Sequence, residues 1–148
     1  MSLFGGSMFR SFMGWCVAFA FTLLNFSAMA DGAVAITLPI DVAKQGISFG
    51  WSSNWPTSEE ARAHALKRCR EQNAERASLC RIVTTFKNEC FANAYDPKEG
   101  TPGVGWAFAP TRELAESRAI ENCETTVGPG RNGTCVIGKD TPVCDNSS

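Results

Sequence analysis

Two stretches of this chain carry the same pattern of residues, spaced 54 or 55 positions apart. Each stretch begins with Gly-Trp, continues after a few residues with Pro-Thr, and ends with Ala-x-x-x-Ala, then Leu or Ile, and then Cys. The matched positions are Trp51 and Trp106, Ala61 and Ala115, Cys69 and Cys123, Cys80 and Cys135, and Cys90 and Cys144. A period kept over so many positions indicates an internal duplication. We place the first repeat at about residues 33–89 and the second at about 90–144.

The first 30 residues differ from the repeats and have the pattern of a secretory signal peptide. Arg10 precedes an almost unbroken apolar run at 12–24, and Ala28-Met29-Ala30 supplies the small residues of a cleavage site. We therefore expect cleavage after Ala30. A membrane anchor is the alternative, but these 13 residues are fewer than the roughly 20 that cross a bilayer. The expected location is periplasmic or secreted, with no stable membrane insertion after cleavage.

The remaining chain, residues 31–148, has 118 residues, which is enough for one domain. It contains 13 basic and 15 acidic residues, so its formal net charge is −2. That balance argues against a nucleic-acid-binding protein and against a polybasic membrane-binding surface. We expect a partner other than nucleic acid, and a monomer.

Six cysteines lie in this part of the chain, an even number in a short exported domain, and this predicts three disulfides. Six cysteines allow about 15 pairings. The duplication favours symmetric bonds, which are Cys69–Cys80 and Cys123–Cys135 within the repeats and Cys90–Cys144 between them. Metal ligation is the weaker alternative because the chain has no Cys-x-x-Cys spacing and only one histidine.

Strands and helices alternate in the same order in both halves. Thr57-Ser-Glu-Glu60 is a capping box that predicts a helix start, and Thr111 begins the corresponding helix. Ala61, Ala65 and Cys69 share one stripe of the first helix. The polar stretches 41–45 and 70–78 are expected to be connections, and the chain from Asp145 onward is expected to fray. The expected strands are 33–39, 46–53, 80–86, 90–95, 104–109 and 134–137, with a short edge piece at 143–144.

Each half therefore has the order strand, strand, helix, strand. The expected fold is α+β: antiparallel strands from both halves form a sheet, two helices pack on one face of it, and disulfides hold the whole together. The alternative is two small sheets, one per repeat, packed side by side.

No catalytic set stands out among the titratable residues. His64 is the only imidazole, and its position in the second repeat is taken by Arg118, which is typical of a solvated helix flank. The carboxylates at the expected helix starts, Glu59, Glu60 and Glu113, are explained by the helix dipole. A pair of glycosidase-type carboxylates would have to come from separate elements. We therefore predict no catalytic residues, no cofactor and no metal site.

Trp55 is the best candidate for a partner contact. Most aromatic residues have a counterpart in the other repeat or alternate along a strand, which is typical of core positions. Trp55 has no counterpart, since Ala109 precedes the proline of the second repeat. The turn-rich loops 96–103 and 126–133 complete the expected contact surface. A role for Trp55 in the core is the alternative.

These motifs together resemble the DUF4189 family of small, exported, mostly bacterial proteins. The resemblance extends from about Ala33 to Cys144. It implies export and a cysteine-stapled, duplicated domain, and it supplies no catalytic residue or cofactor to carry over. The residues that carry it are Gly50-Trp51, the helix from Ala61 to Cys69, Cys80-Arg-Ile-Val, Phe86-Lys-Asn-Glu-Cys90, and Gly105-Trp106 with the helix from Ala115 to Cys123.

The leading functional hypothesis is a non-enzymatic binding module that contacts a protein or cell-envelope partner as an inhibitor or effector. Two alternatives remain. One is a secreted hydrolase that uses carboxylates from different elements, and the other is a structural component of the cell envelope.

Overall fold

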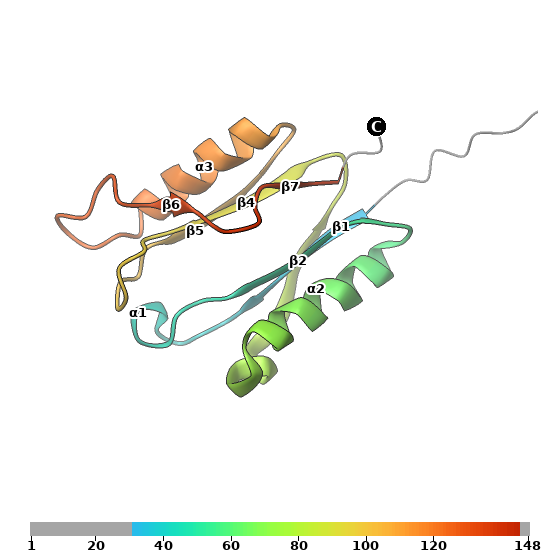
Figure 1. Cartoon of the computed structure of the whole chain (residues 1–148), viewed down its shortest axis with the longest axis horizontal. Coiled ribbons are helices and arrows are strands. Elements are labelled where there is room, and N and C mark those ends of the chain that lie inside the picture. The colour runs from blue at the N-terminus through green and yellow to red at the C-terminus, as the bar shows by residue number, and fades with distance from the viewer. Residues whose placement is uncertain (1–30, 146–148) are drawn as a thin grey trace, which may run out of the picture.

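The computed structural model describes residues 31–145, and the expected signal peptide lies outside the described residues. The chain forms two sheets, which stack on each other between the two long helices (Figure 1). The elements of the first half are β1 (Asp31–Thr37), α1 (Val42–Gln45), β2 (Phe49–Trp55), α2 (Ser58–Gln72), the 3-10 helix η1 (Ala74–Leu79) and β3 (Cys80–Phe86). Those of the second half are β4 (Cys90–Tyr95), β5 (Val104–Ala109), α3 (Arg112–Glu124), β6 (Val136–Ile137) and β7 (Val143–Cys144).

The α+β class is confirmed, but the expected single sheet is wrong. The strands of the first half form an antiparallel sheet of order β2-β1-β3, and those of the second half form another of order β5-β4-β6. β7 also pairs with β4, at the opposite end from β6. Each helix covers the outer face of its own sheet, so the helices do not share a face (Figure 1). The alternative predicted two sheets, one per half, and this number is correct. That alternative placed the sheets side by side, whereas they stack face to face.

The two faces of each sheet explain this arrangement. One face of β1 carries Ala33 and Ala35, which pack with buried Ala61 and Ala65 of α2. The other face carries larger apolar residues that meet the second sheet in a shared core. A single sheet with both helices on one face would leave this second face in water, at a cost of roughly 25 cal/mol per Å² of apolar surface. The shared core consists of Val34, Ile36, Phe49, Trp51, Phe86, Phe91 and Val104.

Both long helices begin at the predicted threonines. The Thr57 hydroxyl accepts a hydrogen bond from the backbone N–H of Glu60 at 3.2 Å and donates one to the Glu60 carboxylate at 2.9 Å. Thr111 accepts in the same way from the N–H of Leu114 at 3.3 Å. These contacts satisfy N–H groups that the first turn of a helix leaves unpaired.

Three segments are more ordered than their polar sequences predicted. The expected connection at 41–45 contains α1, which Asp41 caps by accepting from the N–H of Lys44 at 3.2 Å. The expected loop at 70–78 is mostly helical, because α2 continues to Gln72 and η1 follows. Asp145, expected to fray, is fully buried.

Three disulfides staple the structure, and they join the pairs that the repeats favour. Cys69–Cys80 and Cys123–Cys135 each tie the end of a long helix to the segment that follows, with Cα atoms 6.1 and 6.2 Å apart. Cys90–Cys144 joins β4 to β7. Three disulfides in so short a domain are consistent with an oxidising location outside the cytoplasm.

Candidate functional site

The outer edge of β2 is open over its first part, whereas near its end the N–H of Asn54 donates to the carboxylate of Asp145 at 3.2 Å. β2 pairs only with β1, and no other strand within residues 31–145 pairs with it. The Thr37 N–H donates to the Ser48 carbonyl at 3.0 Å, and the register then pairs Ala35 with Gly50 and Ala33 with Ser52. Hydrogen-bonded pairs alternate along an antiparallel ladder. It follows that Phe49 and Trp51 turn their backbone N–H and C=O groups toward the open edge, up to the register shift that follows Ser52.

Two hollows follow this edge, and both are lined by Trp51. The first has a volume of about 510 Å³ and lies between β2, α2 and Val143. The second, of about 350 Å³, lies between the start of β2, the end of β4 and residues 138–140. We call the two hollows together the β2 groove. One wall is α2 and the other is the C-terminal segment 138–143.

Two aromatic contacts connect α2 to the groove. The ring of His64 stacks on that of Trp55, with centroids 3.5 Å apart and planes at 14°. One helical turn further on, the guanidinium of Arg68 lies 4.0 Å from the centroid of a Trp51 ring. Residues four apart lie on the same face of a helix, and the strand runs the opposite way beside it. Contacts of these kinds are typically worth about 0.5–1.5 kcal/mol each.

The groove is slightly basic. Lys67, Arg68 and Lys139 line it with two acids, Glu71 and Asp140. Both acids already have partners: Glu71 lies 3.6 Å from Lys67, and Asp140 lies 3.6 Å from Arg68. The Arg68–Asp140 pair joins the two walls of the groove. Because both side chains are partly in water, the pair contributes little to stability.

Trp55 is neither fully buried nor fully exposed. It is partly buried against the alanine and cysteine cluster under α2, and it also lines the groove. His64 is exposed, as expected for a helix flank. In the second half, Arg118 instead donates to the Phe108 carbonyl at 3.5 Å. Sequence reasoning did not single out Arg68, whose only sequence signal is its spacing of four from His64.

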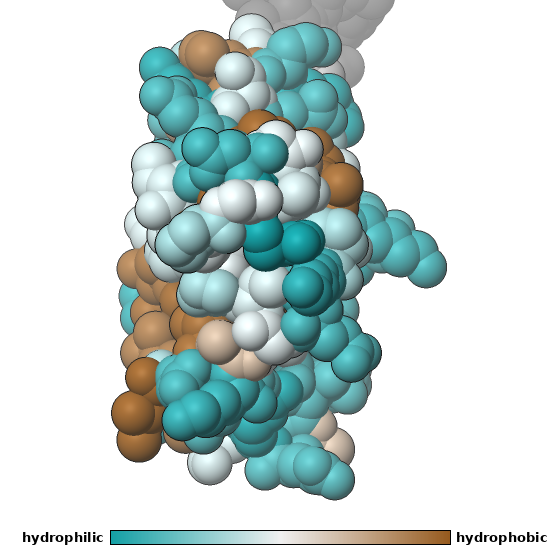
Figure 2. Space-filling model, turned by 90° about the vertical axis from the view of Figure 1, so that its left-hand side faces the viewer, coloured by the Kyte–Doolittle hydropathy of each residue, from teal (hydrophilic) through white to brown (hydrophobic). Residues whose placement is uncertain are grey.

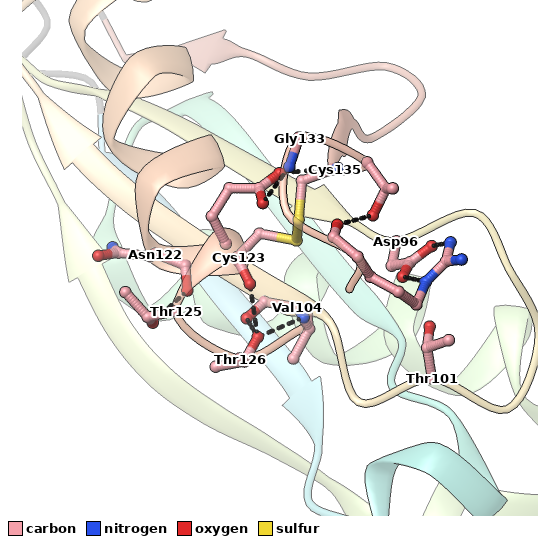
Figure 3. The surroundings of a disulfide bond; sticks show 12 residues. Asp96, Thr101, Val104, Asn122, Cys123, Thr125, Thr126, Gly133 and Cys135 are labelled. Atoms are coloured by element: carbon pink, nitrogen blue, oxygen red, sulfur yellow. Dashed lines mark hydrogen bonds and ion pairs between the residues drawn. A yellow bond between two sulfur atoms is a disulfide. The ribbon is translucent and has the colours of Figure 1, made fainter. Parts of the chain in front are cut away.

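Loops 96–103 and 126–133 lie together at the end of the molecule opposite the β2–α2 connection, which directly follows Trp55 (Figure 1), so they do not share one surface with it. Arg131 donates two hydrogen bonds to the buried carboxylate of Asp96 (Figure 3). These bonds hold the pKa of Asp96 well below its usual range. Next to them, the Glu124 carboxylate accepts from the N–H groups of Gly133 at 2.7 Å and Cys135 at 2.9 Å. The two loops are therefore fixed to each other beside Cys123–Cys135.

This end of the molecule has its own hollow, of about 580 Å³, between α1 and loop 96–103. Figure 2 views this end and shows a mainly hydrophilic surface with hydrophobic residues along one side. Leu38 and Ile40, just before α1, are 55% and 99% exposed. The charged and aromatic residues that line this hollow are Lys44, Tyr95, Asp96, Lys98 and Glu99.

Asp145 is a titratable residue that the sequence did not identify as ordered. It is fully buried, and its Oδ1 accepts from the N–H of Asn54 at 3.2 Å. Burial raises the pKa of Asp145, and the nearby negative charge of Asp31 raises it further. The residue lines none of the three hollows described here.

The predicted helix-start carboxylates Glu59, Glu60 and Glu113 are exposed in the first turns of α2 and α3. Among residues 31–145, no three His, Cys, Asp or Glu side chains come together as a metal site would require. Within the same residues, no helix is long and apolar enough to cross a membrane.

Residues 32–140 match the sequence model of a family described as a domain of unknown function, DUF4189. The chain belongs to the DUF4189 family. The matched residues cover the first sheet almost entirely, the second sheet except β7, both long helices and most of the β2 groove. Neither the curated proteins nor the solved structures include a significant match.

Proposed function

We propose that this DUF4189 protein is an exported, non-enzymatic binding module, and that the β2 groove is its contact surface. The observation that carries the proposal is the convergence of Trp51, Trp55 and Arg68, from a strand and a helix, on one open groove. Aromatic residues and arginine are enriched at the energetic centres of protein interfaces. The protein acts in the periplasm or after release from the cell, as a monomer.

The titratable groups favour a binding module over a hydrolase that uses carboxylates as its catalytic groups. The two carboxylates with shifted pKa values, Asp96 and Asp145, are the natural candidates for acid–base chemistry. Asp96 is neutralised by Arg131, and Asp145 is enclosed away from the hollows. His64 has its ring stacked on Trp55. The binding module is therefore the function that this geometry supports best.

A pull-down with matched variants tests the proposal. The oxidised protein beginning at Asp31 is immobilised and exposed to periplasmic and culture-supernatant extracts of its native host, and captured proteins are identified by mass spectrometry. One stoichiometric partner is expected with the wild type and with Leu114→Ala, an exposed change on α3 outside the groove. Trp55→Ala and His64→Ala should lose it.

The variants also separate binding from folding. Because Trp55 is half-buried, we expect Trp55→Ala to lower the free energy of unfolding by about 2 kcal/mol, roughly half of the loss for a fully buried tryptophan, and a loss of about 4 kcal/mol or more would assign Trp55 to the core. His64 is exposed, so His64→Ala should fold normally. Equal capture by all four proteins would contradict the proposed surface, and no capture by the wild type would contradict the binding module.

A further inference from the structure

The β2 groove occupies the position that a fourth strand would take in the first sheet. Phe91 of β4 lies opposite β2, with its ring 6.1 Å from Phe49 and 6.4 Å from Trp51. Beyond β4, the second sheet continues with β6 and β7, whereas the first sheet stops at β2. Val143 of β7 lines the groove next to the place where such a fourth strand would lie. We propose that the groove binds an extended acidic peptide, which adds to the open edge of β2 as a further strand.

The backbone of β2 supplies the main attraction. Phe49 and Trp51 present N–H and C=O groups at alternate positions, which is the arrangement that an added strand needs. From Phe49 to Trp51 the edge matches a peptide segment of about three residues, at ~3.3 Å per residue. An exposed sheet edge is a template for pairing with another chain, and two walls that flank it leave room for a single strand rather than for a second sheet.

Charge selects an acidic partner. Arg68, Lys67 and Lys139 leave the groove with a formal excess of one positive charge, in a chain whose residues 31–148 carry a net charge of −2. The Asp140 carboxylate, which is 60% exposed, lies 3.6 Å from the Arg68 guanidinium. A carboxylate of the peptide can take the place of Asp140 on Arg68 when the strand enters. Asp140 therefore occupies the site of the incoming carboxylate.

The β2 groove can hold one extended peptide strand more easily than the β2 strand of a second copy of this chain. The edge lies between α2 and residues 138–143, and the same two walls would flank the β2 of a second copy. Two walled edges meet before their backbones come within hydrogen-bonding distance. A single extended peptide has no such walls. This inference rests on the proposed function, because it names the partner of the same groove.

The test selects ligands without assuming their sequence. A phage-displayed library of random linear peptides of about nine residues is panned against the oxidised protein beginning at Asp31. The enriched consensus is then synthesised with a fluorescent label for anisotropy titration. We expect the consensus to be rich in Asp and Glu and to bind about tenfold more weakly when alternate backbone nitrogens are methylated.

Two variants and one local measurement make the result specific. Asp140→Asn should bind the acidic peptide about three- to tenfold more tightly, because it frees Arg68, and asparagine tolerates the positive φ of 62° at this position. Arg68→Gln should bind it about tenfold more weakly. Amide exchange by NMR should slow at Phe49 and Trp51 on peptide binding, while Gly50 and Ser52 stay unchanged because β1 already protects them.

Each contrary outcome overturns a stated part of the inference. Absence of enrichment, or enrichment of basic peptides, rules out the acidic ligand. Affinity that survives backbone methylation rules out strand addition, and a dimer in solution in which the amides of Phe49 and Trp51 exchange slowly without peptide assigns the edge to a second copy. If the pull-down still finds a partner that depends on Trp55, the binding module stands while strand addition fails.

Discussion

Gly50 and Gly105 show how a single residue sets the distance between a helix and a sheet. A Cβ atom at Gly50 would overlap the backbone of Ala65 and Cys69, and one at Gly105 would overlap that of Ala119 and Cys123. The helices lie so close because their facing residues are alanines and cysteines. The Gly-Trp pairs of the sequence therefore have a packing reason for the glycine as well as for the tryptophan.

We predict that Gly50→Ala and Gly105→Ala each lower the free energy of unfolding by about 3 kcal/mol, the upper part of the range for overpacked cores. The overlap is with helix backbone, which cannot rotate away as a side chain can. Urea unfolding followed by fluorescence measures the change. Gly128→Ala is the control, because nothing lies within 4 Å of a Cβ there, and it should be neutral. A neutral Gly50→Ala would show that α2 can move away from β2.

Asp145 illustrates a residue role that depends on tertiary structure alone. Its carboxyl joins the end of the chain to β2 through the N–H of Asn54, whose φ is 60°. Lys87 is near enough to lower its pKa partly, but burial and Asp31 have the opposite effect and prevail. A carboxyl with a raised pKa in the folded state favours its neutral form.

We predict that Asp145→Asn stabilises the protein at pH 7 by about 1 kcal/mol. The wild-type contribution falls as pH rises from the unfolded pKa of about 3.9 through the higher folded pKa, because the folded state binds this proton more tightly. The amide stays neutral and can keep the bond from Asn54. Urea unfolding at several pH values should show the difference closing near pH 3. Exposed Asp140→Asn should give no such trend, and an Asp145→Asn protein that is less stable at every pH would contradict the prediction.

At the scale of elements, the sequence predicts both long helices and most strands because their signals are local. Thr57 and Thr111 cap their helices through hydrogen bonds to residues three positions on. Alternation along 47–51 likewise needs only neighbouring residues. By contrast, α1 and η1 have polar sequences and no apolar stripe. The 136–144 segment follows the edge of β4 only in two short pieces, β6 and β7.

The three disulfides should contribute differently to the free energy of unfolding, because they close loops of different length. We predict a loss of about 3 kcal/mol for Cys69→Ala with Cys80→Ala, and the same for Cys123→Ala with Cys135→Ala, but about 4 kcal/mol for Cys90→Ala with Cys144→Ala. The first two bonds close sequence separations of 11 and 12, and the third closes 54. Urea unfolding of the three double variants compares them directly. A smaller loss for the third pair would contradict the chain-entropy explanation.

The candidate site was only partly predictable from the sequence, because some of its contacts join residues that are far apart in the chain. Trp55 stood out because it has no counterpart in the second repeat. Arg68 did not stand out, because its role in the groove depends on two tertiary contacts. Trp51 must lie on an edge strand, and Asp140 must lie across the groove. Sequence alone does not show which strand ends a sheet. The sequence analysis also grouped Trp55 with loops 96–103 and 126–133. In the structure these loops lie at the end of the molecule opposite the β2–α2 connection, which directly follows Trp55.

At the scale of the whole molecule, the two halves are joined by one shared core. Phe91 of β4 is fully buried, and its ring lies 5.3 Å from Phe108 in its own sheet and 6.1 Å from Phe49 in the other. The order of elements in each half is visible in the sequence. The stacking of the sheets is not, because apolar residues on both faces of β1 are compatible with either a helix or a second sheet above them.

This shared core predicts that neither half is stable alone. Residues 31–89 include β1, β2, α2, β3 and the Cys69–Cys80 disulfide, but without the second half they would expose the large apolar face that carries Phe49, Trp51 and Phe86. A chain of roughly 60 residues also buries too little surface to offset this loss. We expect the isolated, oxidised fragment to keep helical far-UV circular dichroism but to lack near-UV signals and a cooperative urea transition. Adding residues 90–148 should restore both, because the second sheet covers the exposed face. A cooperative transition in the fragment alone would show that each half carries a sufficient core of its own, and that the aromatic layer only joins two independent folding units.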